Sequence, residues 1–356
     1  MRGSGHGSVE AVIVAGGFGT RMRPLTARRP KHLLDVGGVP FLEHQIALLA
    51  EAGVEHVVLA TSYHADAFAP VLGDGSRWGV RLDYVMEEEP LGTAGAIRNA
   101  GRALGDDPDG AVVILNGDIL SGHDLRAQLA DFDSPRGGRQ VDVSLHLVRV
   151  DDPSSYGSVP TDEEGRVTAF VEKSDTPVSD QVNGGSYVFR RRVVDLIPTG
   201  RAVSVERETF PALVGAGRLL VGYVEISYWR DVGTPQALVA ASKDLVLGVA
   251  TSAAMEAEPS GAHVDDGAVV ASSATVNGGS VVARDVRVGD RALVTGSVVM
   301  TGAMVGEAAV VVDSVLGPGA FVGAGADLVD VVLGDEARVP DGVRLRSTAV
   351  ECGAEP

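Results

Sequence analysis

Cysteine is nearly missing from this chain of 356 residues, because Cys352 is the only one. A single cysteine excludes an intrachain disulfide, so the sequence predicts a reducing compartment, the cytoplasm. Aromatic residues are also scarce, at 4%, whereas glycine accounts for 46 residues. This bias favours tight turns and close packing of small side chains over large aromatic clusters.

Positive charge and long apolar runs are lacking as well. The 30 Lys and Arg residues face 48 Asp and Glu residues, which gives a net charge of −18. Charge of this sign repels nucleic acid and anionic lipid, and no apolar run approaches the ~20 residues of a membrane span, so we expect neither partner. Residues 1–9 contain several Gly and Ser residues but no apolar signal core, which predicts a disordered lead-in.

Strand, turn and helix alternate in the first predicted domain, residues 10–249. Apolar runs at residues 11–14, 56–61 and 111–115 predict strands that are buried on both faces. Such strands between helices are typical of an α/β fold with a Rossmann-like, mostly parallel sheet. The segment 141–150 alternates apolar and polar residues instead, which predicts a half-exposed strand.

Two of these strands end in residues suited to binding a ligand. Gly16 and Gly17 follow the first strand, and Asp118 follows the run at 111–115. Ligands of parallel sheets bind outside the carboxyl ends of the strands, so these residues give the first indication of a site. Between the first two strands, Pro40 is expected to open a helix that Gly53 ends.

A six-residue rhythm replaces this pattern in the second predicted domain, residues 261–346. Valine recurs every six residues from Val264 to Val294, and the period resumes after one-residue slips at Val299 and Leu316. A hexapeptide repeat is typical of a parallel β-helix, in which each hexapeptide forms one face of a triangular coil. An ordinary valine-rich β domain is the alternative, and residues 250–260 are a candidate linker.

The Gly-rich turn at residues 16–21 (GGFGTR), trailed by Pro30 and Lys31, is the strongest local signal. Glycines let backbone N–H groups approach phosphate oxygens, and Arg21 and Lys31 supply positive charge. The turn is not the dinucleotide fingerprint, because its third glycine is missing, and no Gly-Lys-Ser/Thr follows as in a Walker loop. The pattern therefore predicts a different kind of triphosphate loop.

This signature resembles that of the nucleotidyltransferases that make NDP-sugars, the NDP-sugar pyrophosphorylases, with the greatest similarity to actinobacterial mannose-1-phosphate guanylyltransferases. The resemblance covers nearly the whole chain, including a left-handed β-helix tail. It implies a Mg²⁺-dependent enzyme that joins a sugar 1-phosphate to a nucleoside triphosphate and releases pyrophosphate. GTP and mannose 1-phosphate are the expected substrates, and a homo-oligomer is expected. The loop residues that would bind the nucleotide are Ala15, Gly16, Gly17, Gly19, Thr20 and Arg21.

Within this resemblance, Arg21 would steady the departing pyrophosphate and Lys31 would contact the phosphates. The turn at residues 87–96 would lie against the nucleobase, where Gly92 permits close approach and Thr93 opens a helix. Glu87 is the candidate to accept hydrogen bonds from the N1–H and N2 amino groups of guanine. Any of the three consecutive glutamates could serve, and an acidic surface turn is the alternative for the other two.

Asp118 and Asp231 are the expected metal ligands. Each lies inside a motif of the resemblance, Asn-Gly-Asp at 116–118 and Trp-Arg-Asp at 229–231. Two carboxylates together with phosphate oxygens suit Mg²⁺, which prefers hard oxygen ligands and few of them from the protein. An isolated Asp after a strand is more commonly a turn former or helix cap, and that remains the alternative.

The sugar phosphate is expected to bind through four residues implied by the resemblance. Gly157 would lend its backbone, Glu172 and Asn183 would bind hydroxyl groups, and Lys173 would hold the phosphate. Taken alone, a Glu-Lys pair is a solvated pair in most proteins. The expected catalytic residues are therefore Arg21, Lys31, Asp118 and Lys173.

The predicted reaction is a single in-line attack of the sugar phosphate on the α-phosphorus of GTP. The nucleophile is already ionised near pH 7, so no general base is required, and the task is to position two anions and offset their repulsion.

Two departures leave the acceptor open. Lys31 is followed by His32 where the family usually has Pro, and Asn183 by Gly184 where the mannose enzymes usually have Ala. A paralogue acting on a heptose or cyclitol 1-phosphate is one alternative, and a non-catalytic NDP-sugar-binding regulatory subunit is another. An acetyltransferase activity in the β-helix would need a basic histidine. His263 is the only histidine after residue 146 and lies in the first coil, which disfavours this activity.

Overall fold

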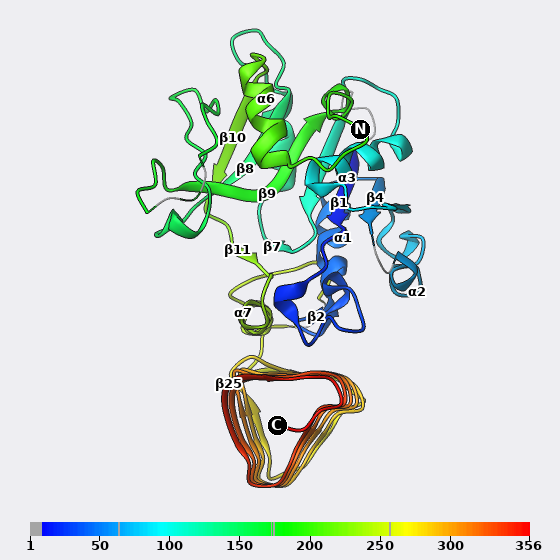
Figure 1. Ribbon diagram of the computed structural model, residues 1–356, viewed down its shortest axis with the longest axis vertical. Coiled ribbons are helices and arrows are strands. Elements are labelled where there is room, and N and C mark those ends of the chain that lie inside the picture. Colours follow the sequence, from blue (N-terminus) through cyan, green and yellow to red (C-terminus); the bar gives the residue numbers. More distant parts are fainter. Residues whose placement is uncertain (1–8, 63–64, 172, 174, 256–257) are drawn as a thin grey trace. The chain divides into compact units, whose positions relative to one another are not determined.

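The computed structural model describes residues 9–62, 65–171, 173, 175–255 and 258–356 (Figure 1). The expected lead-in, except for residue 9, and Glu172 lie outside the described residues. Within those residues, no helix combines the length and the apolar character needed to cross a membrane.

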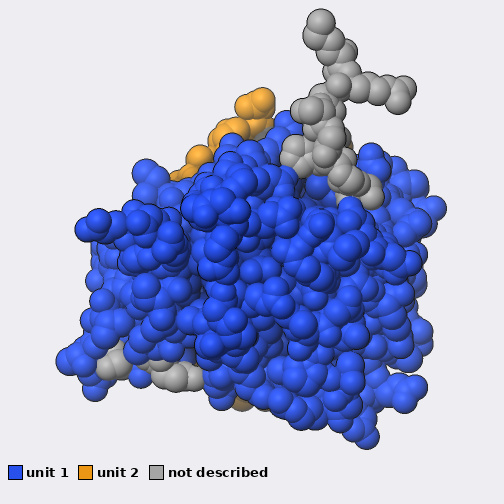
Figure 2. Space-filling model, turned by 90° about the horizontal axis from the view of Figure 1, so that it is seen from above, with its two compact units in different colours: residues 1–17, 45–229 blue, residues 18–44, 230–356 orange. Residues whose placement is uncertain are grey.

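Two compact units make up the chain, and Figure 2 colours them separately. Unit 1 comprises residues 1–17 and 45–229, and unit 2 comprises residues 18–44 and 230–356. The chain passes from one unit to the other directly after Gly17, within the helix α1 (Phe41–Glu51) and within the strand β11 (Trp229–Asp231). Unit 2 therefore contains most of the Gly-rich signature as well as the C-terminal repeats.

Unit 1 is built on a seven-stranded sheet with the order β10-β8-β9-β6-β1-β4-β5. The antiparallel strand β9 pairs with β6 and β8, and the other pairings described are parallel, so the predicted mostly parallel α/β sheet is confirmed. The strands are β1 (Glu10–Ala15), β4 (His56–Thr61), β5 (Arg81–Met86), β6 (Ala111–Asn116), β8 (Val143–Arg149), β9 (Gln181–Arg190) and β10 (Leu220–Glu225).

Helices pack against this sheet through their apolar faces. Helix α1 buries Leu42, Ile46 and Leu49 completely, as its 3.6-residue spacing predicts. α3 packs on β1 and β4, and α4 packs on β8, β9 and β10. The remaining helices and short strands are α2 (Ala69–Leu72), α3 (Gly92–Ala100), α4 (Leu125–Asp133), α5 (Arg191–Val194), α6 (Phe210–Gly215), α7 (Pro235–Val246), β2 (Asp35–Val36), β3 (Val39–Pro40) and β7 (Ile119–Ser121).

The prediction of a half-exposed strand at residues 141–150 is wrong. Strand β8 buries six consecutive residues, Val143–Val148. The reason is that both faces of β8 are covered: α4 packs on the face of Ser144, and Val143, Leu145 and Leu147 on the other face belong to the core cluster that includes Phe210. Its polar residues Ser144 and His146 are therefore core residues rather than members of a solvent face.

Parallel strands arranged as a triangular coil form the C-terminal part of unit 2, so the predicted β-helix is confirmed (Figure 1). From Val282 onward the repeating valines and leucines are buried inside the coil, whereas Val270 and Val276 are partly buried and Val264, in the first coil, is 42% exposed. Val264 pairs with Val282 eighteen residues later, whereas Val282, Val299, Leu316 and Leu333 follow one another at intervals of seventeen. The one-residue slips in the sequence therefore mark coils that are one residue shorter.

Three sets of strands line the faces of the coil. They are β12 (Ala262–Val264), β13 (Val269–Val270), β14 (Thr275–Asn277), β15 (Ser280–Val282), β16 (Arg287–Val288), β17 (Leu293–Thr295), β18 (Val298–Val299), β19 (Met304–Val305), β20 (Val310–Val312), β21 (Val315–Leu316), β22 (Phe321–Val322), β23 (Asp327–Leu333), β24 (Arg338–Val339) and β25 (Arg344–Val350).

Candidate functional site

The carboxyl ends of β1, β4 and β5 bring three segments of unit 1 together. Ser62, directly after β4, donates a hydrogen bond to the carbonyl of Gly16 at 2.7 Å. A Cβ atom at Gly16 would lie 3.6 Å from Glu87 Oε2 and 3.5 Å from Ser62 Oγ. Gly16 and Glu87, which are 71 positions apart in the sequence, therefore lie at one edge of the sheet, where parallel sheets bind ligands.

Glu87 differs from the two glutamates that follow it. Its side chain is buried, whereas Glu88 and Glu89 are exposed. Oε2 accepts a hydrogen bond from the N–H of Leu91 at 3.2 Å, while Oε1 is buried without a hydrogen-bond partner among the described residues. Burial raises the pKa of Glu87, and the bond from Leu91 opposes that rise. An acceptor held in this state is ready to receive a donor from a ligand.

Gly92 and Thr93 begin α3 and hold this turn to the segment before α6. A Cβ atom at Gly92 would lie 2.7 Å from the carbonyl oxygen of Val203, and the backbone there has φ of 69°. The hydroxyl of Thr93 accepts a hydrogen bond from the N–H of Val205 at 2.8 Å. Both residues thus fix the turn that carries Glu87, in addition to the role expected of them at the base.

Asp118 lies in the tight turn between β6 and β7 and is half-buried. The turn is held by the N–H of Gly117, which donates to the carbonyl of Val14 at 2.9 Å. The amide of Gln45 donates to the carbonyls of Asn116 and Ile119, at 2.7 and 3.0 Å, on either side of the carboxylate. Asp118 is therefore carried by a backbone fixed at several points.

The residues expected at the sugar are mostly tied into the protein. The Asn183 amide donates to the Tyr187 hydroxyl at 2.7 Å and to Glu206 at 2.5 Å, and its oxygen accepts from the N–H of Gly185 at 3.0 Å. A Cβ atom at Gly157 would lie 2.9 Å from the carbonyl of Val171, so glycine is needed for this close approach. Lys173 is exposed, and Glu172 lies outside the described residues.

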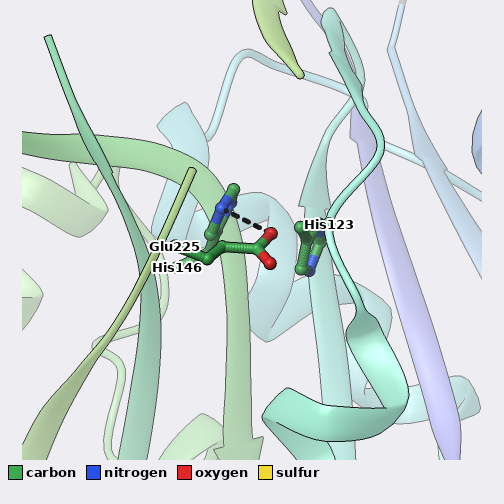
Figure 3. A group of neighbouring side chains, drawn as sticks. All are labelled: His123, His146 and Glu225. Carbon is green, nitrogen blue, oxygen red and sulfur yellow. Dashed lines mark ion pairs between the residues drawn. The ribbon is translucent and has the colours of Figure 1, made fainter. Parts of the chain in front are cut away.

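A cluster that the sequence did not single out lies against β9 at Gly184: His123, His146 and Glu225 (Figure 3). The two imidazole rings stack with centroids 4.2 Å apart and planes 12° apart. Imidazole binds metal ions along the ring plane, and two nearly parallel rings do not point their nitrogens at one ion. The arrangement therefore fits a buried stack better than a metal centre.

Burial keeps both histidines neutral at pH 7. It lowers the pKa of His123 to about 4 and that of His146 to about 2, and the neighbouring His123 contributes to the second value. Glu225 Oε1 lies 3.3 Å from His146 Nε2, but this contact is not an ion pair while the imidazole is uncharged. A Cβ atom at Gly184 would lie only 2.5 Å from His146 Nδ1. His146 thus explains why residue 184 is a glycine.

In unit 2, the signature loop folds back on itself. Gly19 has φ of 61°, and a Cβ atom there would lie 3.0 Å from Cβ of Lys31. The Thr26 hydroxyl donates to the carbonyl of Gly19 at 2.8 Å. Thr20 is exposed, as is Gly17 in unit 1. The loop therefore brings Lys31 beside the glycine that precedes Thr20 and Arg21.

Arg21 and Asp231 come together at Gly233, also in unit 2. A Cβ atom at Gly233 would lie 2.7 Å from an Arg21 guanidinium nitrogen and 2.7 Å from Asp231 Oδ1. Gly233 is therefore required for both side chains to occupy these positions. The sequence placed Arg21 and Asp231 in separate motifs, and the fold of this unit joins the two motifs.

The signature loop also packs on the β-helix. Arg29 forms a two-bond ion pair with Asp335, at 3.0 and 2.6 Å, and the Asp335 side chain is only 6% exposed. The thiol of Cys352 lies 3.6 Å from the carbonyl oxygen of Pro24. A Cβ atom at Gly38 would lie 2.9 Å from the ring of His263. His263 therefore packs against the loop segment, and the C-terminal coils form part of its support.

Comparison with known proteins agrees with this organisation. Residues 10–246 match the family model of nucleotidyl transferases, and residues 260–353 match that of the GMPPB C-terminal domain. Mannose-1-phosphate guanylyltransferase of Mycobacterium tuberculosis is 50% identical over 282 residues, which cover 79% of this chain and 77% of that protein. Mannose-1-phosphate guanylyltransferase 1 of Arabidopsis thaliana is 34% identical, covering 80% of this chain and 78% of that protein.

Solved structures give a similar result. HddC from Yersinia pseudotuberculosis, solved as a complex with GMP-PN, has a TM-score of 0.55 at 28% identity, covering 65% of this chain and 97% of that one. A putative glucose-1-phosphate thymidylyltransferase from Bacillus anthracis has a TM-score of 0.59 at 25% identity, covering 66% of this chain and 94% of that one. Both similarities cover about two thirds of the chain.

Acid is expected to destabilise the protein through the histidine stack. The pKa values of His123 and His146 lie below the ordinary value of 6.5, so the unfolded chain takes up these protons first. The free energy of unfolding should therefore fall as the pH drops from about 6.5 to about 4, by up to ~1.4 kcal/mol per pH unit for each histidine. Urea denaturation across this range should show a smaller fall for His146→Gln than for wild type.

Other buried groups set the baseline for that comparison. Burial raises the pKa values of Asp35 and Glu87, so these carboxyl groups act with the opposite sign in both proteins, and burial lowers the pKa of His44, which acts in the same sense as the stack in both. The difference between the two curves therefore isolates the histidine. Equal slopes for variant and wild type would contradict the assignment.

The ion pair between Arg29 and Asp335 should be strongly coupled in a double-mutant cycle. Replacing both residues by Ala, singly and together, should give an interaction energy of about 1–3 kcal/mol in denaturant unfolding, because the carboxylate is buried. The adjacent pair of Arg28 and Glu336, with side chains 52% and 68% exposed, is the control and should give less than about 0.5 kcal/mol. Similar values for the two pairs would show that Arg29 does not anchor the loop.

Proposed function

We propose a specific reaction from one established premise: this chain belongs to the nucleotidyl transferase family. The reaction is the transfer of the GMP moiety of GTP to mannose 1-phosphate, giving GDP-mannose and pyrophosphate. The names of the relatives from Mycobacterium tuberculosis and Arabidopsis thaliana support this choice. The GMP-PN complex of HddC supports a guanine nucleotide.

The observation that carries the proposal is the buried carboxylate of Glu87 beside Gly16. It lies at the carboxyl ends of three adjacent parallel strands, and one of its oxygens has no hydrogen-bond partner among the described residues. Guanine presents two adjacent donors, N1–H and the N2 amino group, to such a carboxylate, whereas adenine presents an acceptor at N1. We infer that Glu87 selects guanine. The nucleotide would be cradled by the signature loop, residues 16–21, together with Gly92.

The chemistry requires two anions to meet at one phosphorus atom. An oxygen of the sugar phosphate attacks the α-phosphorus of GTP in line with the departing pyrophosphate, so one P–O bond forms as another breaks. Arg21 and Lys31 are assigned to the triphosphate and Lys173 to the sugar phosphate. Fixed cations lower the repulsion between the reactants without having to reorient during the reaction.

Enzymes of this family generally use a divalent metal ion, and we propose Mg²⁺. Asp118 and Asp231 offer hard carboxylate oxygens, which are the protein ligands that Mg²⁺ prefers. The bound ion would neutralise phosphate charge. Arg21, which lies near Asp231, would also offset the negative charge of the phosphates, and it would do so without a proton transfer.

Three further assignments complete the proposal. Gly157, Glu172 and Asn183 are assigned to the sugar, with the Asn183 amide kept in one orientation by Tyr187 and Glu206. Residues 10–249 would carry the substrates and residues 261–346 would form the supporting domain. A homo-oligomer is proposed as well.

Pyrophosphate release tests the reaction. Purified protein with Mg²⁺ should release pyrophosphate from GTP and mannose 1-phosphate faster than from any other pairing in a matrix of nucleoside triphosphates and sugar or cyclitol 1-phosphates. Asp118→Asn should abolish turnover while the thermal midpoint stays near that of wild type. Full activity of Asp118→Asn in Mg²⁺, or no release with any pairing, would overturn the proposal.

Lys173 can be tested against another lysine of the same chain. The sequence contains only Lys31, Lys173 and Lys243, and Lys243 forms a 2.8 Å ion pair with Asp313 of the β-helix. Lys173→Ala should raise the KM for mannose 1-phosphate by about 10- to 100-fold, the equivalent of one charged hydrogen bond, with a smaller effect on the KM for GTP. Lys243→Ala should leave both constants near wild type. A similar loss in the two variants would remove Lys173 from the site.

A further inference from the structure

A cavity of about 420 Å³ in unit 1 is lined by four arginines and by none of the described residues assigned to the substrates. Arg98 and Arg102 come from α3 and the turn after it, Arg191 begins α5, and Arg201 follows the loop at residues 198–200. A group of four guanidinium ions is unexpected in a chain with a net charge of −18. Such a group is retained against its own repulsion only where the surroundings or a ligand compensate for it.

The protein compensates for part of this charge. Asp195 pairs with Arg98 and with Arg191, the latter at 2.9 Å, and Glu208 pairs with Arg201 at 2.7 Å. Hydrogen bonds and charge from Arg191, with Arg98, hold the pKa of Asp195 below its usual range. Asp195 and Glu208 thus pair with Arg98, Arg191 and Arg201, and among the described residues no carboxylate lines the cavity itself.

Two of the four arginines hold the protein together, and two can bind a ligand. Arg98 belongs to the first group through its ion pair with Asp195. Arg191 is buried and donates to the carbonyls of Gly105 and Gly101, both at 3.0 Å, so it builds the cavity wall. Arg102 is exposed and has no hydrogen bond or ion pair within the described part of the chain. Arg201 is exposed and uses one guanidinium nitrogen for both Glu208 and the carbonyl of Ala202. Arg102 and Arg201 therefore keep donors for a ligand.

We propose that this cavity binds the phosphate group of a small metabolite, with Arg102 and Arg201 as the contacting residues. A phosphate monoester carries close to two negative charges near neutral pH and offers three acceptor oxygens to the two exposed arginines, whereas a carboxylate carries one charge and two oxygens. The planar fork of a guanidinium ion also suits phosphate oxygens.

The cavity also borders the turn that carries Glu87. Leu91 lines it, donates its N–H to Glu87 Oε2 at 3.2 Å and accepts a hydrogen bond from the N–H of Val203 at 2.8 Å. Arg201 is two residues before Val203, so an anion held by Arg201 acts on the segment that fixes Leu91. Occupancy of the cavity is therefore expected to change the affinity for GTP. This coupling rests on the proposed function, but the anion site does not.

Calorimetric titration of the full chain with inorganic phosphate tests the site, and glycerol 3-phosphate as a second probe separates free phosphate from a monoester. Arg102→Ala should weaken binding by at least about tenfold, as expected for a lost charged hydrogen bond, without lowering the thermal midpoint. Arg287→Ala, which removes an exposed β-helix arginine, should bind as wild type does. Arg201→Ala should weaken binding in the same sense as Arg102→Ala.

The proposed substrate site also attracts phosphate, so Lys173→Ala provides the discriminating comparison. Phosphate binding that is lost in Lys173→Ala and unchanged in Arg102→Ala would overturn the cavity assignment.

The coupling has a test of its own: the Kd of GTP should change with phosphate in wild type, and part of that change should vanish in Arg102→Ala. An identical phosphate effect in both proteins would overturn the coupling, because it would reflect competition at the substrate site. Absence of GTP binding would overturn the proposed function and the coupling together, while loss of phosphate binding in Arg102→Ala would still establish the site.

Discussion

In the proposed reaction, attraction between a few fixed cations and phosphate oxygens must overcome the field of a molecule with a net charge of −18. Flexible surface lysines would do this poorly, because each loses side-chain entropy on binding. The chain has only three lysines, and the structure restricts Lys31 by packing its side chain on Gly19. The exposed guanidinium group of Arg21 lies beside Gly233 and Asp231. Part of the entropic cost of fixing Lys31 is therefore met when the chain folds.

This requirement gives the β-helix a direct part in the site. The loop that carries Arg21 and Lys31 belongs to unit 2, whose C-terminal coils hold it through Arg29 and Asp335. The bond joins residues 306 positions apart. A β-helix is a stiff platform, because each coil is hydrogen-bonded to its neighbours along the stack. The coils thus support the segment that is proposed to bind phosphate.

Local patterns explain what could be predicted from the sequence. Apolar runs predicted β1, β4 and β6, and the spacing of apolar residues predicted α1. The hexapeptide period, with its one-residue slips, predicted the coils. These features depend on neighbours close in the chain. The burial of β8 depends instead on α4 against one face and on Phe210, more than 60 positions later, in the core cluster against the other. The anchor between Arg29 and Asp335 and the stack of His123 on His146 likewise depend on contacts between distant segments, for which the sequence carries no periodic signal.

The same reasoning changes the weight of one sequence departure. Gly184, where the mannose enzymes usually have Ala, left a heptose or cyclitol phosphate open as the acceptor. In the structure the space that an alanine methyl group would need is occupied by His146, whose Nδ1 would lie 2.5 Å from it. Trp229 also donates to the carbonyl of Gly184 at 2.9 Å, which fixes the backbone there. Gly184 in β9 is therefore required by the neighbouring core histidine, and its presence is no argument for an acceptor other than mannose 1-phosphate.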